Sequence, residues 1–209
     1  MVPAFEQALA DYTGAGYAVC ANSATSALHA ACVALNVDEC SRVWVSANTF
    51  VASANCAAML GASIDFIDVD PQTGNISAET LQKKLQQSPE QTWPTHIIVV
   101  HFAGNPCDMA AISSLLNDSD CRIIEDASHA LGAEANNCKV GGGKFSDISV
   151  FSFHPVKMIT SGEGGCALTS DVELAQRMRC FISHDIERDP QRLQQLGIDV
   201  DGDWFFVSQ

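Results

Sequence analysis

The chain has 209 residues and is 47% hydrophobic, and its 25 acidic residues against 11 basic ones give a formal net charge of −14. This length and apolar content are enough for one large core, or for one large domain and part of another. The acidity argues against binding to nucleic acid or an anionic membrane, because both depend on clustered lysine and arginine. One small phosphorylated ligand remains compatible, since amides at a helix N-terminus can bind a single phosphate.

Nine cysteines are spread along the chain, at positions 20, 32, 40, 56, 107, 121, 138, 166 and 180. Their odd number and the lack of a Cys-x-x-Cys pair disfavour a disulfide framework and structural zinc, so we expect no metal. Several lie in apolar runs, where a free cysteine packs as a small hydrophobe. The sequence shows no secretory leader and no apolar run of membrane-spanning length. We therefore expect a soluble, cytoplasmic protein.

Predicted helices and strands alternate along the chain, and Ser77 is the expected N-cap of one of the helices. The elements are helix 3–12 with Phe5, Ala8 and Leu9 on one face, strand 17–21, a helix to about 35, strand 43–45, helix 51–60, strand 63–67, a helix from 78, strand 95–101, helix 108–116, strands 121–125, 147–152 and 165–169, and helix 171–183. This order predicts an α/β fold whose mostly parallel sheet is covered by helices on both faces.

Five of the predicted strands are followed by a segment that carries candidate site residues. Because ligands of such sheets bind at the carboxyl ends of the strands, we expect these segments to form one site. They are residues 22–26, 48–50, 101–104, 126–129 and 152–157.

Lys157 and Asp126 point to the chemistry of that site. Lys157 lies in a loop that continues into the glycine-rich segment 162–165, and Asp126 ends an apolar strand. A lysine amine can form a Schiff base with the aldehyde of pyridoxal phosphate, and a carboxylate can keep its pyridine nitrogen protonated. Taken singly, Lys157 is more typical of a surface lysine and Asp126 of a helix cap. Their occurrence together with the other segments favours a pyridoxal phosphate site.

The remaining candidate residues fit the same cofactor. Thr25 and Ser26 open a helix, where amides and hydroxyls can bind a phosphate, although an ordinary N-cap has the same pattern. Phe50 could stack on a pyridine ring, or belong to the core. His129 would lie near the ring or serve as a structural hydrogen-bonding residue. The Ser152 hydroxyl could reach the phosphate.

In these motifs the chain resembles the DegT/DnrJ/EryC1/StrS family of sugar aminotransferases, which are fold-type I pyridoxal phosphate enzymes. The resemblance runs from about Phe5 to His184, and the segments that carry it are 22–28, 48–53, 66–70, 100–104, 124–133 and 151–165. Within the family, the Ser-Phe-His-Pro-Val-Lys string and the following Glu-Gly-Gly are most similar to the UDP-4-keto-6-deoxy-sugar transaminases of the pseudaminic acid pathway.

The resemblance implies a three-layer α/β/α large domain like that of aspartate aminotransferase, with a mostly parallel mixed sheet. It implies that Lys157 carries the cofactor and moves the proton, and that Asp126 pairs with the pyridine nitrogen. The matching positions imply that Phe50 stacks on the ring, that His129 lies beside it, and that Thr25, Ser26 and Ser152 hold the phosphate. The partners it implies are a nucleotide-sugar substrate, an amino-acid donor such as glutamate, and a second subunit.

The resemblance also implies how the chain is divided. We expect residues 1–184 to form the cofactor-binding large domain, and residues 185–209 to be a truncated connection toward a largely missing small domain. The aromatic residues 204–206 suggest that this tail packs on something. Two other functions stay open, a non-catalytic binding or assembly domain of the same fold, and a relative that dehydrates sugars. The presence of Lys157 favours transamination, because dehydrating relatives replace this lysine.

Overall fold

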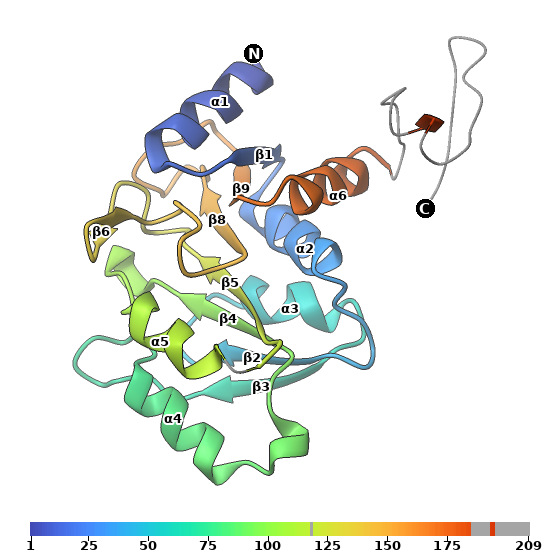
Figure 1. The fold of residues 1–209 in the computed structure, drawn as a ribbon. Coiled ribbons are helices and arrows are strands. Elements are labelled where there is room, and N and C mark those ends of the chain that lie inside the picture. The colour runs from blue at the N-terminus through green and yellow to red at the C-terminus, as the bar shows by residue number, and fades with distance from the viewer. Residues whose placement is uncertain (118, 185–192, 195–209) are drawn as a thin grey trace.

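A computed structural model describes residues 1–117, 119–184 and 193–194 (Figure 1). Every helix and strand expected from the sequence is present within one to two residues at most ends, and Ser77 caps its helix as predicted. The elements are α1 (Val2–Thr13), β1 (Tyr17–Ala21), α2 (Ala24–Ala34), β2 (Arg42–Ser46), α3 (Ala52–Ala58), β3 (Ser63–Ile67), α4 (Ala78–Gln87), η1 (Glu90–Thr92), β4 (His96–Val100), η2 (Phe102–Gly104), α5 (Met109–Leu116), β5 (Arg122–Asp126), β6 (Glu134–Ala135), β7 (Cys138–Lys139), β8 (Ile148–Ser152), β9 (Gly165–Thr169) and α6 (Val172–Ile182).

The main sheet has seven strands in the order β1-β9-β8-β5-β4-β2-β3. Strand β9 is antiparallel to both of its neighbours, and all other pairs are parallel, so the sheet is mostly parallel and mixed as expected. The carboxyl ends of β2, β4, β5 and β8 therefore meet at one edge. The chain leaves each of these strands into a segment predicted to carry site residues.

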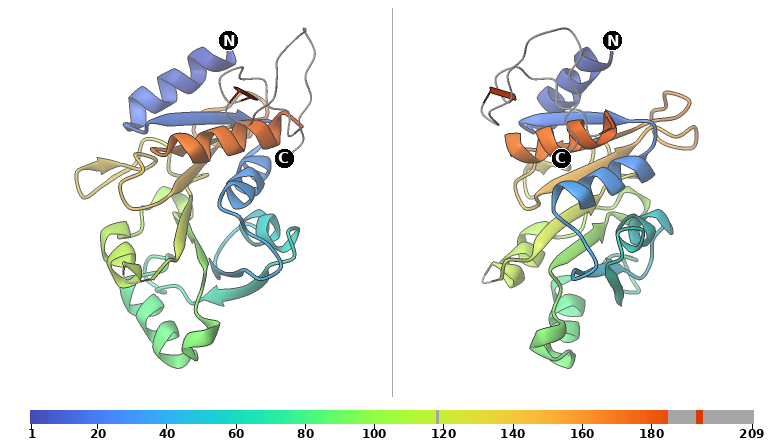
Figure 2. Two further views of the ribbon diagram at one scale, coloured as in Figure 1. Left: turned by 45° about the vertical axis from the view of Figure 1, so that its right-hand side comes forward. Right: turned by 90° about the vertical axis from the view of Figure 1, so that its right-hand side faces the viewer.

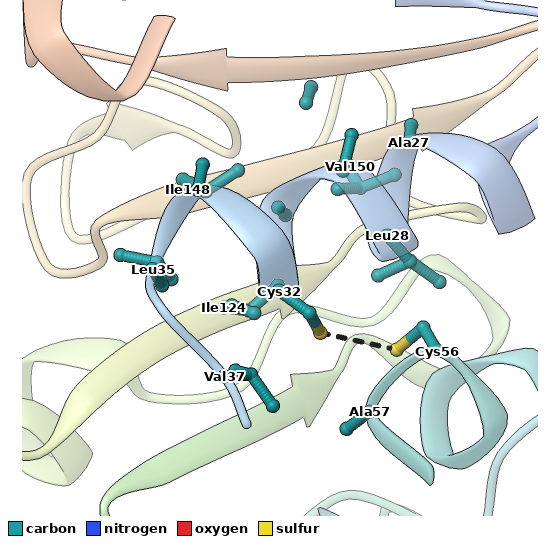
Figure 3. Close-up of a cluster of buried hydrophobic side chains, with 14 of the residues drawn as sticks. Ala27, Leu28, Cys32, Leu35, Val37, Cys56, Ala57, Ile124, Ile148 and Val150 are labelled. Carbon is teal, nitrogen blue, oxygen red and sulfur yellow. Dashed lines mark hydrogen bonds between the residues drawn. The ribbon is translucent and has the colours of Figure 1, made fainter. Parts of the chain in front are cut away.

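Helices cover both faces of the sheet, which gives three layers (Figure 2). Helices α2, α3 and α6 pack on one face, and α1, α4 and α5 lie over the other. Alternate residues of the central strands supply the two cores, so that Ile124 points to the α2 side and Ile123 to the α4–α5 side. Figure 3 shows the α2 side, where Ile124, Ile148 and Val150 meet the small residues of α2 and α3. Small residues on α2 let the helix lie close to the sheet, and so fix its N-terminus beside the strand ends.

Two local predictions were incomplete. The buried residues of α1 are Leu9, Ala10 and Thr13, whereas Ala8 is exposed and Phe5 lies edge-on to Phe153 at 5.1 Å between ring centroids. The short hairpin β6–β7 was not predicted, because strands of two residues show no alternation. Its turn holds Asn136 and Asn137 at φ 52° and 58°, a conformation that asparagine tolerates better than most residues.

The aromatic residues 204–206 and most of the tail 185–209 lie outside the described residues. Among the helices that the structure describes, none combines the length and the apolar character needed to cross a bilayer.

Candidate active site

A cavity of about 470 Å³ lies at the carboxyl edge of the sheet, where the predicted segments meet. Its volume is in the range that encloses a small organic ligand. All of the predicted site residues except Ser26 line it, and they come from elements far apart in the sequence. These residues are Thr25, Phe50, Asp126, His129, Ser152 and Lys157.

Asp126 ends β5 and faces the cavity from the α2–α3 side of the sheet, with only 5% of its surface exposed. The hydroxyl of Ser53 on α3 donates to Oδ2 at 2.5 Å. The hydroxyl of Ser128 donates to Oδ1 at 2.6 Å, and its backbone N–H donates to the same oxygen at 3.2 Å. No helix follows Asp126 directly, so it does not act as a helix cap. Three donors hold the carboxylate in one orientation toward the cavity.

Lys157 lies in the loop 153–164 between β8 and β9. The loop is closed at its base by hydrogen bonds from Phe153 N–H to Gly164 and from Ser161 N–H to Phe153, both to carbonyl oxygens. At its tip the N–H of Lys157 donates to the carbonyl of His154, with Pro155 at the second position of the turn, which proline favours. A tight turn on a closed loop directs the half-buried lysine into the cavity.

The ionisable groups of the cavity influence one another. Burial lowers the pKa of the Lys157 amine, and the Asp126 carboxylate opposes this shift. Burial also lowers the pKa of His129, the Lys157 charge lowers it further, and Asp126 acts in the opposite direction. A lysine with a lowered pKa is more often neutral, and a neutral amine is the nucleophilic form. The imidazole of His129 is correspondingly favoured in its neutral state.

Hydroxyl groups line the cavity at the N-terminus of α2. Ser23 is the N-cap, and its Oγ accepts the N–H of Ser26 at 3.1 Å. Thr25 faces the cavity, together with Ser152 at the end of β8. The Ser26 hydroxyl instead contacts Ser23 Oγ at 3.1 Å, and Ser26 lines a neighbouring cavity, which Thr25 also borders. The structure therefore brings Thr25 and Ser152 to the cavity and turns Ser26 away from it.

Phe50 lies on the rim of the cavity with 73% of its surface exposed, so it is not a core residue. His129 lies on the wall, and the turn of η2 packs tightly against its backbone. A side-chain carbon on Gly104 would come within 2.6 Å of the His129 carbonyl oxygen, and the φ of Gly104 is +81°. Only glycine fits this contact, which positions Phe102 beside His129 at the cavity.

Several residues at the cavity were not among the predicted site residues. Ser128, which lines the cavity, and Ser53, which is buried behind Asp126, both donate to Asp126. His154 Nε2 and Glu163 Oε1, at the two ends of the lysine loop, lie 3.7 Å apart. Only Ser128 could have been found from a local pattern, because an aspartate often accepts a hydrogen bond from the residue two positions on and so closes a turn. Nothing in the sequence near Ser53 indicates that α3 lies against β5.

The residues of the cavity fit pyridoxal phosphate by their chemistry. They combine one amine, one buried carboxylate with fixed orientation, an accessible aromatic ring, and hydroxyls at the N-terminus of a helix of 11 residues. An anion is favoured at such a helix end by its free amides and its dipole. Each chemical part of the cofactor therefore has a matching group on the cavity wall.

Residues 1–200 match the DegT/DnrJ/EryC1/StrS aminotransferase family. The chain belongs to this family. It is 45% identical over 182 residues to the UDP-4-amino-4,6-dideoxy-N-acetyl-beta-L-altrosamine transaminase of Campylobacter jejuni serotype O:2, covering 87% of this chain and 47% of that protein.

Solved structures of the family share the fold. The aminotransferase PseC of Helicobacter pylori, described as involved in pseudoaminic acid biosynthesis, aligns with a TM-score of 0.78 and 34% identity over 90% of this chain and 49% of its own. NtdA of Bacillus subtilis with bound cofactor PMP aligns with a TM-score of 0.79 and 28% identity over 89% of this chain and 40% of its own. The chain thus spans about half the length of the relatives that it matches.

Proposed function

We propose that this chain is the cofactor-binding half of a pyridoxal phosphate-dependent aminotransferase acting on a nucleotide-linked deoxy-sugar. The observation that carries the proposal is the meeting of the Lys157 amine and the buried Asp126 carboxylate on one cavity. Family membership supports it, and so does the sugar transaminase at 45% identity.

The residues that surround the cavity have different roles in this proposal. When bound, pyridoxal phosphate supplies an aldehyde for amine exchange and an electron-withdrawing ring. Asp126, oriented by Ser53 and Ser128, holds a proton on the ring nitrogen through its carboxylate. Lys157 takes and returns protons at Nζ, and its lowered pKa makes the neutral, proton-accepting amine more accessible.

The remaining residues bind and orient. Phe50 would stack on the ring, and His129 on the cavity wall would lie beside it. Thr25 and Ser152 would hold the phosphate together with the first turn of α2. Both the hydroxyl and the backbone N–H of Ser26 contact Ser23 Oγ, so Ser26 would keep its predicted phosphate role only if these contacts opened.

The substrates and the assembly follow the same reasoning. We infer an amino-acid donor such as glutamate and a sugar keto group as acceptor, with residues 1–184 as the large domain and 185–209 as the connection beyond it. A homodimer is supported by apolar side chains exposed around the cavity mouth, among them Phe50 and Val156 at 73% and 77% exposure. In the part of the chain that the structure describes, which includes all nine cysteines, no cysteine is joined in a disulfide, and this agrees with the cytoplasm. The sugar product would serve cell-surface polysaccharides.

The first experiment is an absorption spectrum of the chain with pyridoxal phosphate, followed by glutamate. We expect a visible band of covalently bound cofactor that declines as glutamate converts it to the amine form. After borohydride reduction, the cofactor should be found on the fragment that contains Lys157. Lys157→Ala should abolish this adduct, and Lys83→Ala, which changes an exposed lysine on α4, should leave it intact.

The other outcomes separate the alternatives. A band that forms on Lys157 and does not respond to glutamate would favour a binding or assembly domain, or a dehydrating relative. A reduced adduct that survives Lys157→Ala on the same fragment would refute the assignment of the lysine.

A further inference from the structure

Cys20 and Cys166 face each other on two neighbouring strands of the sheet. Cys20 on β1 and Cys166 on β9 are directly opposite in the antiparallel register, between the pairs Val19–Ala167 and Ala21–Gly165. Opposed residues of this kind have Cα atoms about 4.5–5.5 Å apart. A disulfide needs roughly 4.4–6.8 Å. Both side chains lie on the same face of the sheet, in the cluster under α1, so little backbone movement is required to join them.

The two thiols differ in access and in acidity. Cys20 is partly exposed and lines a cavity of about 660 Å³ near His29 and Phe181, whereas Cys166 has 0% exposure. The hydrogen bond from Cys166 lowers the pKa of Cys20, against burial and the charge of Glu6. The hydrogen bond to Cys20 and burial both raise the pKa of Cys166. A dissolved oxidant can therefore reach only Cys20, the more acidic thiol of the two.

A second cysteine pair in the chain separates the effect of solvent access on thiol oxidation from the effect of proximity. Cys32 on α2 and Cys56 on α3 are 3.5 Å apart between their sulfur atoms, and both have 0% exposure (Figure 3). The hydrogen bond with Cys32 and burial raise the pKa of Cys56. This pair is close together but enclosed in the core, so it serves as an internal control for proximity alone.

We propose that Cys20 and Cys166 form a reversible disulfide when the chain meets a hydroperoxide. The Cys20 thiolate attacks the peroxide, so that an S–O bond forms, the O–O bond breaks, and water leaves after protonation. The Cys166 sulfur then attacks Cys20, forming the S–S bond and releasing the second oxygen as water. Two thiols lose two electrons and two protons, and one hydrogen peroxide is reduced to two waters.

The proposed bond lies close behind the candidate active site. Gly165 directly precedes Cys166, and it touches the start of α2 so closely that a side-chain carbon there would come within 2.3 Å of Ser23 and Ala24. The disulfide would therefore join β1 to β9 one residue from the point where the lysine loop meets the N-terminus of α2. The proposal does not depend on the cofactor or on the reaction.

The test is a map of disulfides in the native 209-residue chain after hydrogen peroxide. Thiols are then blocked with N-ethylmaleimide under denaturing conditions, and the chain is cut with chymotrypsin. Cleavage after Tyr17 and Leu28 separates Cys20 from Cys32, whereas trypsin leaves Cys20, Cys32 and Cys40 on the fragment 1–42. We expect a fragment that links Cys20 to Cys166, lighter by two hydrogens and lost on treatment with dithiothreitol. Cys32 and Cys56 should carry the blocking group.

Two variants sharpen the result. In Cys166→Ala, Cys20 should accumulate as a sulfenic acid that dimedone traps, because the second thiol is missing. In Cys32→Ala, the Cys20–Cys166 link should form as before. The proposal is wrong if native Cys20 proceeds to a sulfinic acid without the link. It is equally wrong if the Cys32–Cys56 link forms as fast, and both of these results can be read from the unaltered chain even where a variant fails to fold.

Discussion

Glu125 and Asp126 are neighbours on β5, equally buried at 5% exposure, and they serve opposite faces of the sheet. Glu125 points to the α4–α5 side, where His101 Nε2 donates to it at 2.7 Å, the Ser149 hydroxyl donates at 3.1 Å, and the Ser146 hydroxyl donates as well. Asp126 points to the α2–α3 side and borders the active-site cavity. Burial alone therefore does not distinguish a structural carboxylate from a functional one.

The hydrogen-bonding partners of Glu125 and Asp126 distinguish the two carboxylates. His101 Nδ1 accepts the N–H of Cys107 at 3.1 Å, so its Nε2 carries the proton that is donated to Glu125. Burial alone would raise the pKa of Glu125, but the hydrogen bonds from His101, Ser146 and Ser149 hold it below its usual value. Asp126 has two hydroxyl partners and one amide, and it faces an amine across open space. We infer that Glu125 fixes the fold and that Asp126 is available to a ligand.

The largest expected effect is on stability. Glu125→Ala should lower the free energy of unfolding by about 3 kcal/mol or more, because buried His101 and Ser149 and half-buried Ser146 lose a charged acceptor that is worth roughly 1–3 kcal/mol to each buried donor. Urea unfolding followed by circular dichroism measures this change.

The matched control is Asp126→Ala, which also removes a buried carboxylate from β5. It should cost less, because Ser128 borders the open cavity, where water can replace the lost carboxylate as its partner. Equal losses for the two variants would contradict the division between a structural and a functional carboxylate.

The second prediction concerns the reaction. Asp126→Asn keeps the shape and removes the charge, so the covalent cofactor band should still form. The decline of that band with glutamate should slow by about 100-fold or more, since proton placement at a reacting group contributes roughly 10²–10⁴-fold. Stopped-flow absorption measures the rate. Glu125→Gln, matched in chemistry on the opposite face, should react like the unchanged chain, and a comparable slowing there would remove the contrast.

Much of this architecture could be predicted from the sequence because it depends on short-range patterns. Apolar runs such as 96–100 and 148–152 are buried on both faces, and polar residues directly after them mark the strand ends. The hairpin of β6 and β7 was beyond reach, because two-residue strands carry no period and only the pair Asn136-Asn137 marks the turn.

The site could be predicted from the sequence only where a local segment marks a site residue. Lys157 and Asp126 could be paired because both follow strands of one parallel sheet. The bond from Ser53 to Asp126 spans 73 positions and depends on how α3 is seated on the sheet, which no local pattern specifies. Thr25 and Ser26 are adjacent in a helix, so about 100° of rotation separates their side chains, and only the packing of α2 decides which one meets the cavity.

A third, smaller effect should follow from the support of Asp126. Ser53→Ala removes the donor to Oδ2 and leaves the carboxylate charged, so we expect the glutamate-driven rate to fall by about tenfold, the equivalent of one hydrogen bond to a charged group. On the other face, Ser149→Ala removes a donor to Glu125 and should affect urea unfolding rather than the rate. If Ser53→Ala changed only stability, orientation of Asp126 would not be the task of this serine.

The smallest effect is a shift in the titration of Lys157. Asp126 raises the pKa of this amine against the larger effect of burial, so Asp126→Asn should lower that pKa further. Glu125→Gln should leave the pKa of Lys157 unchanged, since Glu125 lies on the other side of the sheet.

The rate of amine labelling at Lys157, followed by mass spectrometry across a pH series without cofactor, gives this pKa directly. A lower pKa favours the neutral, reactive amine, so labelling of the Asp126→Asn chain should begin at lower pH than that of the unchanged chain. A shift toward higher pH, or equal shifts in both variants, would show that Lys157 does not respond to the Asp126 charge.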